Sequence, residues 1–281
     1  FYNEAGLFAV DNMKNYDTSL YYRRYNFRSN VDVQVFKYTK LNINLATSFE
    51  RKNEPGGDAS SIWSYTLNTT PIAYPLFYSD GTLSGPADND GANPYVLLTQ
   101  KGYREKFWNT ATSTINLQQD FSNWITKGLT ANLKFAFDAM NYQHVARIKT
   151  PQQWIASGRD EEGNLIKTET VVGEESLSLS KSSNSRRTSY LEASINYART
   201  FGRHSVGALF LYQHSQKNYI NTSETDPDKF LPYRNQGIAG RVTYDYDNRY
   251  FIEANFGYNG SENFAKGNRF GFFPSVALGW I

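Results

Sequence analysis

Hydrophobic and polar residues alternate along several stretches of the chain. Between Tyr25 and Val35 the odd positions are mostly apolar, whereas the even positions carry arginine, asparagine, aspartate and glutamine. A period of two residues is typical of a β-strand with one apolar and one polar face. The pattern therefore predicts a strand in this segment rather than an amphipathic helix.

The same alternation predicts further strands along the rest of the chain. They cover residues 41–50, 106–120, 129–140, 191–197, 205–213, 242–246 and 250–259, and a last one starts near Phe273. The stretch 205–213 alternates poorly, so the pattern leaves its facing open. Because only Tyr38, Thr39 and Lys40 separate the first two strands, we expect them to form an antiparallel hairpin.

The predicted connections between these strands alternate in length. Short ones lie near Thr39, Lys127, Gly202 and Asn248, and long ones span residues 52–105, 142–186 and 216–236. Outer-membrane barrels have short periplasmic turns and long external loops, and their strands are about ten residues long. The sequence therefore predicts an all-β fold: an antiparallel transmembrane β-barrel segment of about nine strands with long extracellular loops.

A soluble β-sandwich or a repeat array is the structural alternative, because its strands also alternate between two faces. The length of the predicted strands and the sorting of the connections by length count against it. The polar faces also carry Arg, Asp and Glu, where a sandwich would bury apolar side chains. The barrel is the preferred interpretation.

Alternation also predicts which way individual side chains face. The set expected to face lipid is Val31, Val33, Val35, Leu41, Ile43, Leu45, Leu133, Phe135, Ile252 and Phe256. The set expected to face the lumen is Arg28, Asp32, Asn44, Lys134, Glu253 and Asn255. A shift of one residue in register would exchange the two sets.

Composition supports this interpretation. Aromatic residues make up 16% of the 281 residues, with 21 Tyr and 19 Phe, although mean hydropathy is −0.61 and 20% of residues are charged. Strands that face lipid on one side and water on the other need both kinds of residue. No apolar run approaches the roughly 18 residues of a spanning helix. The 29 basic and 27 acidic residues are interspersed, which argues against a nucleic-acid partner.

The ends of the chain and its lack of cysteine add two expectations. The sequence contains no cysteine, which excludes disulfides, thiolate metal ligands and a cysteine nucleophile. It begins at Phe1 without a leader-like segment and stops at Ile281 within a strand-like pattern. Because a barrel must close, we expect the chain to be part of a larger barrel.

Three segments resemble one known family. The run RVTYDYDNRYFIEANFGYNGSENFAKGNRFGFFPSVALGW, residues 241–280, is similar to the barrel signature of the SusC/RagA family of TonB-dependent outer-membrane transporters. The runs RRYNFRSNVDVQVFKYTKLNINL, residues 23–45, and ITKGLTANLKFAFD, residues 125–138, resemble earlier strands of the same barrel. The C-terminal run is the specific one, because NGSENF is followed by RFGFFPS and GW.

The resemblance implies a barrel of about 22 strands that holds an N-terminal plug. It also implies a SusD-like surface lipoprotein as an external lid, TonB as the driving partner through the plug, and a location in the outer membrane of a Gram-negative bacterium. Residues 1–281 are then a partial barrel domain, and the plug domain and the TonB box are expected outside this chain. The implied function is active import of a nutrient, an oligosaccharide or a peptide. A passive porin or a surface adhesin with the same strands is the alternative.

Five aromatic side chains and one carboxylate in the two longest predicted loops are the candidate substrate contacts: Trp63, Tyr65, Tyr74, Tyr78, Trp154 and Asp80. Flat apolar rings with neighbouring carboxylates or amides suit a glycan or a peptide. The alternative is that these rings pack the loops on themselves or against the lid protein. The segment 54–100 is expected to be ordered, with a short helix over residues 59–67 capped by Asp58 and ended by Pro71 and Pro75.

The chain offers little for catalysis or metal binding, and no cofactor is expected. Asp88, Asp90 and Asn93 beside Gly91 loosely resemble a calcium loop but lack the terminal bidentate Glu, so a surface turn is the preferred interpretation. The three histidines, His144, His204 and His214, come without a Gly-x-Ser-x-Gly elbow. We therefore expect no enzyme activity. Phe270, Phe272, Phe273, Pro274 and Trp280 are expected to anchor the chain at the membrane interface.

Overall fold

The structure, a computed structural model, describes residues 1–8, 16–70, 72–86, 92–221 and 225–281. Its strands are β1 (Tyr2–Ala5), β2 (Tyr21–Phe36), β3 (Thr39–Pro55), β4 (Gly102–Asp120), β5 (Leu129–Ile148), β6 (Gln153–Arg159), β7 (Leu165–Val171), β8 (Ser178–Phe201), β9 (His204–Asn221), β10 (Tyr233–Tyr246), β11 (Tyr250–Ser261) and β12 (Phe270–Trp280). Its helices are α1 (Ala59–Asn68), α2 (Pro94–Thr99) and the short 3-10 helix η1 (Pro227–Phe230).

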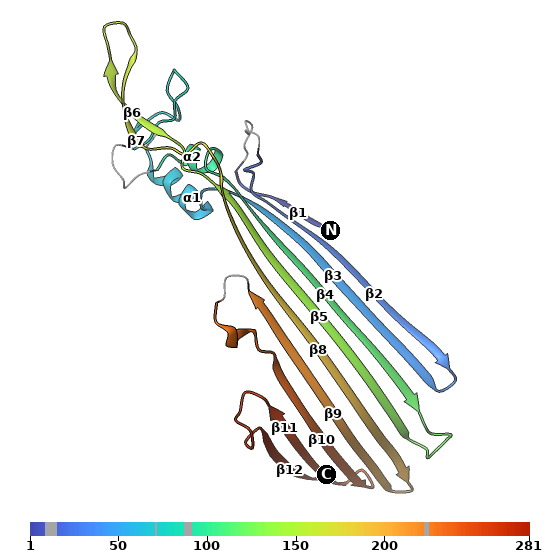
Figure 1. The fold of residues 1–281 in the computed structure, drawn as a ribbon. Coiled ribbons are helices and arrows are strands. Elements are labelled where there is room, and N and C mark those ends of the chain that lie inside the picture. Colours follow the sequence, from blue (N-terminus) through green and yellow to red (C-terminus); the bar gives the residue numbers. More distant parts are fainter. Residues whose placement is uncertain (9–15, 71, 87–91, 222–224) are drawn as a thin grey trace. The chain divides into compact units, whose positions relative to one another are not determined.

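Ten of these strands form one sheet in the order β1-β2-β3-β4-β5-β8-β9-β10-β11-β12 (Figure 1). Each strand from β8 to β12 pairs antiparallel with the next one along the chain. Strands β6 and β7 form a separate two-stranded hairpin. In the described residues the sheet is therefore an open meander with β1 and β12 at its edges, as expected for a segment of a barrel wall.

The chain divides into two compact units. The loop unit comprises Phe1–Tyr25, Phe49–Trp108 and Tyr142–Ser183, and the wall unit comprises Asn26–Ser48, Asn109–Asn141 and Asn184–Ile281. The wall unit contains all four short turns between neighbouring long strands. The loop unit contains α1, α2 and the β6–β7 hairpin.

The strands are longer than the sequence pattern predicts, so the long connections are shorter. Strand β8 has 24 residues instead of the predicted 191–197, and β12 begins at Phe270 rather than near Phe273. The early part of β8, SLSKSSNSRRTS, is polar except for Leu179. Alternation marks only the portion of a strand that has one apolar face, and pairing continues where that contrast is lost.

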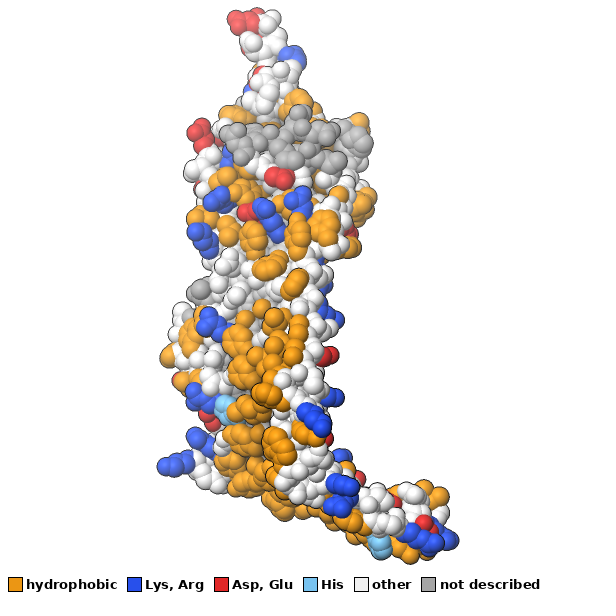
Figure 2. All heavy atoms as spheres, turned by 90° about the vertical axis from the view of Figure 1, so that its right-hand side faces the viewer, with side chains coloured by type: hydrophobic (Ala, Val, Ile, Leu, Met, Phe, Trp, Pro, Cys, Tyr) orange, Lys and Arg blue, Asp and Glu red, His pale blue; other side chains and the backbone are white. Residues whose placement is uncertain are grey.

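The register confirms the predicted alternation in β8, β10 and β11. Ile195, Phe210, Gly240 and Phe256 lie side by side across β8 to β11, whereas their chain neighbours Asn196, Leu209, Arg241 and Asn255 lie side by side on the opposite face. The same pairing shows which residues of β9 lie on each face, although the alternation along β9 itself is ambiguous. We call the face of Ile195 and Phe256 the apolar face, and that of Asn196 and Asn255 the polar face. Figure 2 shows hydrophobic side chains gathered along the sheet.

The structure agrees with the predicted tight turn after β10 and with the predicted facing of the aromatic residues of β12, except at Phe273. Asp247 and Asn248 lie in the predicted turn and have φ of 57° and 51°, the left-handed values of a type I′ turn. Arg249 N donates a 3.0 Å hydrogen bond to the carbonyl of Tyr246 and closes that turn. Phe270, Phe272 and Trp280 share the apolar face with Ile252 and Phe256. Phe273 lies on the polar face, where it pairs with Gly257. Successive residues of a strand point to opposite faces, so Phe273 cannot share a face with Phe272.

The loop unit is ordered around a small core. Helix α1 begins after Asp58, whose side chain accepts a hydrogen bond from Ser61 N, so the predicted cap is confirmed. Ile62 of α1 and Val96 of α2 are 1% and 2% exposed, and the two helices contact each other. Pro71 lies outside the described residues. Within the described part of the chain, none of the helices combines the length and apolar character that crossing a membrane requires.

Candidate functional site

The predicted substrate contacts, all in the loop unit, fall into two groups. Trp63 on α1 is 50% exposed, and Tyr65, on the same helix, is half-buried. The hydroxyl of Tyr74 donates a hydrogen bond of 2.9 Å to the carbonyl of Ala92 and so ties the loop to itself. Tyr78, Asp80 and Trp154 belong to the second group.

That second group joins the first long loop to the β6–β7 hairpin. Leu83 and Gly85 exchange backbone hydrogen bonds of 2.9 Å with Trp154. The hydroxyl of Tyr78 accepts a 2.9 Å hydrogen bond from Ala156 N. Lys167 pairs with Asp80 and lies over the ring of Trp154. The structure therefore brings these three predicted residues together, in contacts that dock one loop on another.

Electrostatics favour the docked arrangement of the hairpin. Hydrogen bonds from Lys167 and then from Thr82 hold the pKa of the exposed Asp80 carboxyl well below its usual range. Asp80 is therefore ionised at neutral pH. The ion pair stabilises docking above the ordinary carboxyl pKa and is lost only as pH falls through the lowered value.

Asn93 fixes the loop between α1 and α2. Its side-chain amide donates to the carbonyls of Leu76 and Ser84 at 3.1 and 3.0 Å, and its oxygen caps α2 by accepting from Tyr95 N at 3.0 Å. The residue is 1% exposed, so the predicted surface turn is wrong at this position. The other residues of that pattern, Asp88, Asp90 and Gly91, lie outside the described residues.

The ranges that the structure describes contain no group of three His, Asp or Glu side chains placed to hold a metal ion. His204 packs against Tyr244 and Tyr246 at the end of the wall unit, and its Nδ1 lies 2.7 Å from the Tyr244 hydroxyl. This histidine therefore belongs to an aromatic cluster.

A polar hollow runs over the polar face of the wall unit. It is lined by Asp32, Asn42, Asn44, Thr114, Asn116, Asn132, Lys134, Glu192 and Ser194. Asn42 donates to Asp32 at 2.6 Å and Asn116 donates to Asn42 at 3.2 Å, so the side chains of three strands form a chain of hydrogen bonds. Asp32, Asn44 and Lys134 therefore share one polar face, as the alternation predicts.

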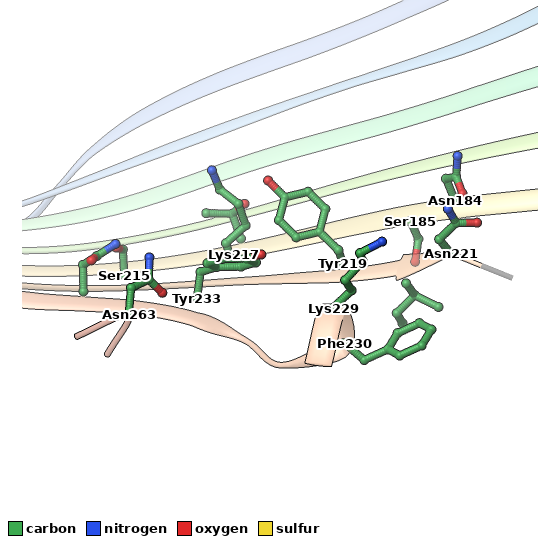
Figure 3. A pocket seen from close by; sticks show the side chains of 13 residues that line it. Asn184, Ser185, Ser215, Lys217, Tyr219, Asn221, Lys229, Phe230, Tyr233 and Asn263 are labelled. Atoms are coloured by element: carbon green, nitrogen blue, oxygen red, sulfur yellow. The ribbon is translucent and has the colours of Figure 1, made fainter. Parts of the chain in front are cut away.

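A cavity of about 700 Å³ lies at the end of that face where β9 and β10 meet their long connection. Its lining residues come from β8, β9, η1, β10 and the connection after β11: Asn184, Ser185, Thr188, Ser215, Lys217, Tyr219, Ile220, Asn221, Lys229, Phe230, Tyr233, Asn235 and Asn263. We call it the strand-end pocket. Figure 3 shows Lys217 and Tyr219 extending from β9 to the same side of the sheet.

Aromatic rings and amides dominate the strand-end pocket. Tyr219 and Tyr233 meet edge to face with centroids 5.8 Å apart, and they are 39% and 42% exposed. Lys217 pairs in register with Thr188 and Tyr233, and within the described chain its amino group has no hydrogen-bond or ion-pair partner. Half-exposed rings beside amides and an amino group present both apolar faces and hydrogen-bond donors to a ligand.

The strand-end pocket is not among the sites predicted from the sequence. Ser215, Lys217 and Tyr219 stand at every second position, which marks one face of a strand but gives no sign of a binding site. The decisive information is the register of β9 with β10, which places Tyr233 next to Lys217. The connection between the two strands carries no sequence pattern that fixes this register.

Comparisons with known proteins point to a single family, although no family model matches the chain. The chain is 24% identical over 291 residues to the TonB-dependent receptor P3 of Formosa agariphila. This match covers 92% of the chain and 26% of that receptor. A segment of 41 residues is 49% identical to the TonB-dependent receptor SusC of Bacteroides thetaiotaomicron and covers 15% of this chain and 4% of that protein. The structure matches the RagAB peptide transporter with a TM-score of 0.61 at 14% identity, over 93% of this chain and 30% of that one.

The chain is SusC/RagA-like. This conclusion confirms the family resemblance of the three sequence segments and the expected fold, an antiparallel barrel wall with long loops. A second structure, the RagAB peptide importer in the "open-open" state, matches with a TM-score of 0.60 at 16% identity. The SusC/RagA-like chain spans about a quarter of the length of TonB-dependent receptors P3 and P26 of Formosa agariphila.

Proposed function

We propose that this chain is part of the barrel wall of a TonB-dependent importer in the outer membrane of a Gram-negative bacterium. Its apolar face contacts lipid and its polar face lines the lumen. The plug domain, through which TonB acts, lies in a part of the protein outside this chain. A SusD-like lipoprotein closes the barrel from outside, and the loop unit contributes to that contact.

The strand-end pocket is the observation that supports a substrate-binding role. It lies on the polar face at the end of the strands where the long connections emerge, which is the external end of the lumen in this proposal. Its tyrosines suit the flat faces of sugar rings or the side chains of a peptide, and its asparagines suit hydroxyl or amide groups. Either an oligosaccharide or a peptide fits this chemistry.

The loop residues that the sequence predicts as substrate contacts are not part of the strand-end pocket. Trp63 and Tyr65 remain candidates for contacts with substrate or lid, because they lie on a helix that is partly open to solvent. Tyr74, Tyr78, Asp80 and Trp154 support them by holding the loops in one arrangement.

Replacing both pocket tyrosines by alanine, Tyr219→Ala with Tyr233→Ala, is expected to lower uptake on the order of tenfold, because each ring contributes about 0.5–1.5 kcal/mol of contact energy. Uptake of a labelled oligosaccharide or peptide mixture is measured in cells that produce the full-length protein. Tyr219→Phe with Tyr233→Phe keeps the rings and is the matched control. If the alanine variant is inserted normally and transports at the parent rate, the pocket has no part in import.

Energy coupling is tested in the same cells by collapsing the proton gradient across the inner membrane. An importer driven through TonB loses uptake, whereas a passive porin retains it.

A further inference from the structure

A second hollow lies on the opposite side of the sheet, where β9 to β12 reach the long-connection end of the apolar face. It has a volume of about 170 Å³, and its lining includes His214, Arg234, Glu262, Arg269 and Phe270. We call it the basic groove. The proposed function makes no use of it, because substrate passes along the other face.

Register places the basic groove on the apolar face. His214, Gln236, Gly260 and Phe270 lie side by side across four strands. The row two residues nearer the short turns contains Tyr212, Ile238, Tyr258 and Phe272. Because alternate residues share a face, the groove continues this apolar, aromatic row directly.

Aromatic rows mark the height of the groove relative to a membrane. Tyr246, Tyr250 and Trp280 form the row at the short turns, and Tyr258 lies eight residues further along β11 than Tyr250. Eight residues span about 26 Å along a strand and roughly 20 Å after tilt, close to the apolar band of about 25 Å between the two aromatic girdles of an outer-membrane barrel. His214 and Phe270 lie just beyond the upper girdle, at the level of lipid headgroups.

The floor of the groove is formed by an aromatic ring over a glycine. A Cβ atom on Gly260 would lie 2.4 Å from Cε1 of Phe270, so the ring occupies the space that a larger residue would need. The ring of Phe270 also stacks on Tyr258 with centroids 5.1 Å apart. The polar groups of the groove therefore stand on an apolar base.

Charge in the basic groove is only partly balanced. Arg234 pairs with Glu262 at 3.5 Å and donates to Gln216 at 3.0 Å. Arg269 donates through Nε to the carbonyl of Phe264 at 3.1 Å. Across the described residues, the terminal nitrogens of Arg269 and both ring nitrogens of His214 have no hydrogen-bond partner. One guanidinium and one imidazole are left to bind an anion.

We propose that the basic groove binds the phosphate of a phosphorylated lipid in the outer leaflet. Arg269 and His214 hold the phosphate oxygens, and the rings of Phe270 and Tyr258 pack against the acyl chains below. Guanidinium groups match phosphate geometry, and a groove at headgroup height on a lipid-facing wall meets lipid before any soluble anion. This inference rests on the outer-membrane placement in the proposed function, but not on import.

The test measures lipid retention by the full-length protein in detergent. Native mass spectrometry compares added bis-phosphorylated lipid A with its dephosphorylated analogue. We expect the phosphorylated lipid to bind about tenfold more tightly, and His214→Gln with Arg269→Gln to abolish that preference. Arg241→Gln, the same charge change on the polar face, is expected to keep it. Heat-dependent migration in gels verifies that each variant is folded.

Two results would overturn the lipid site. One is an equal preference for phosphorylated lipid in the double variant and the parent protein. The other is release of the lipid by inorganic phosphate at the concentration at which competing lipid A releases it, which would indicate a site for free anions. Uptake by the double variant is expected to stay near the parent level. Lipid retention therefore tests the lipid site, and uptake tests the import function independently.

Discussion

Removing residues 57–92 and joining Gly56 to Asn93 through a short Gly-Ser linker is expected to reduce uptake to background while the barrel still inserts. The segment contains α1 and the partners that dock the β6–β7 hairpin, so its loss changes both long loops of the loop unit. Uptake, surface labelling and co-purification of the proposed SusD-like lipoprotein measure the outcome. A barrel that inserts and still transports at the parent rate would contradict the proposed role of the loop.

Asn93→Ala provides a graded version of the same experiment. It leaves the chain length unchanged but removes the hydrogen bonds to Leu76, Ser84 and Tyr95. Losing these buried bonds destabilises the loop by about 1–3 kcal/mol. Limited proteolysis is expected to cut this variant faster within the loop. Asn68→Ala, an exposed residue at the end of α1, is the matched control and is expected to match the parent protein.

Expressed alone, residues 1–281 are expected to aggregate rather than fold as a soluble monomer. Phe272, Val276 and Leu278 of β12 are 61%, 70% and 78% exposed, and β12 is an unpaired edge of the sheet in the described residues. Apolar surface next to an open strand edge promotes association. Size-exclusion chromatography and thermal unfolding in buffer without detergent test this. A monomer with a single sharp unfolding transition would contradict it.

Alternation along the chain predicted the central part of most strands of the wall unit. Val31, Ile43 and Phe135 stand at alternate positions in long runs, because each strand needs a continuous apolar stripe. The need for one apolar face also explains why the first part of β8 was not predicted. In the first part of β8 nearly all residues are polar, so no period of two marks the strand in the sequence. From Asn184 onwards the register with β9 continues the strand through this polar stretch.

The loops were predictable only where local chemistry decides the structure. Asp58 before an apolar segment predicted helix α1, because a side-chain cap acts within one turn. Helix α2, the β6–β7 hairpin and the strand-end pocket depend on contacts between distant segments. Tyr219 and Tyr233 come together through register rather than through any pattern in their surroundings, and Asn93 is buried by a loop that precedes it in the chain.

The central claim is that neighbouring residues of β11 face lipid and water in turn. Residues 1–281 contain no cysteine, so Phe256→Cys and Asn255→Cys each introduce one labelling site into them. Any cysteine elsewhere in the full-length protein is replaced by serine, and the two variants are compared in intact outer membranes. A spin label at each position is exposed to oxygen, which concentrates in lipid, and to a water-soluble nickel chelate. The account predicts strong relaxation by oxygen at position 256 and by the chelate at position 255. The reverse pattern, or the same response at both positions, would contradict it.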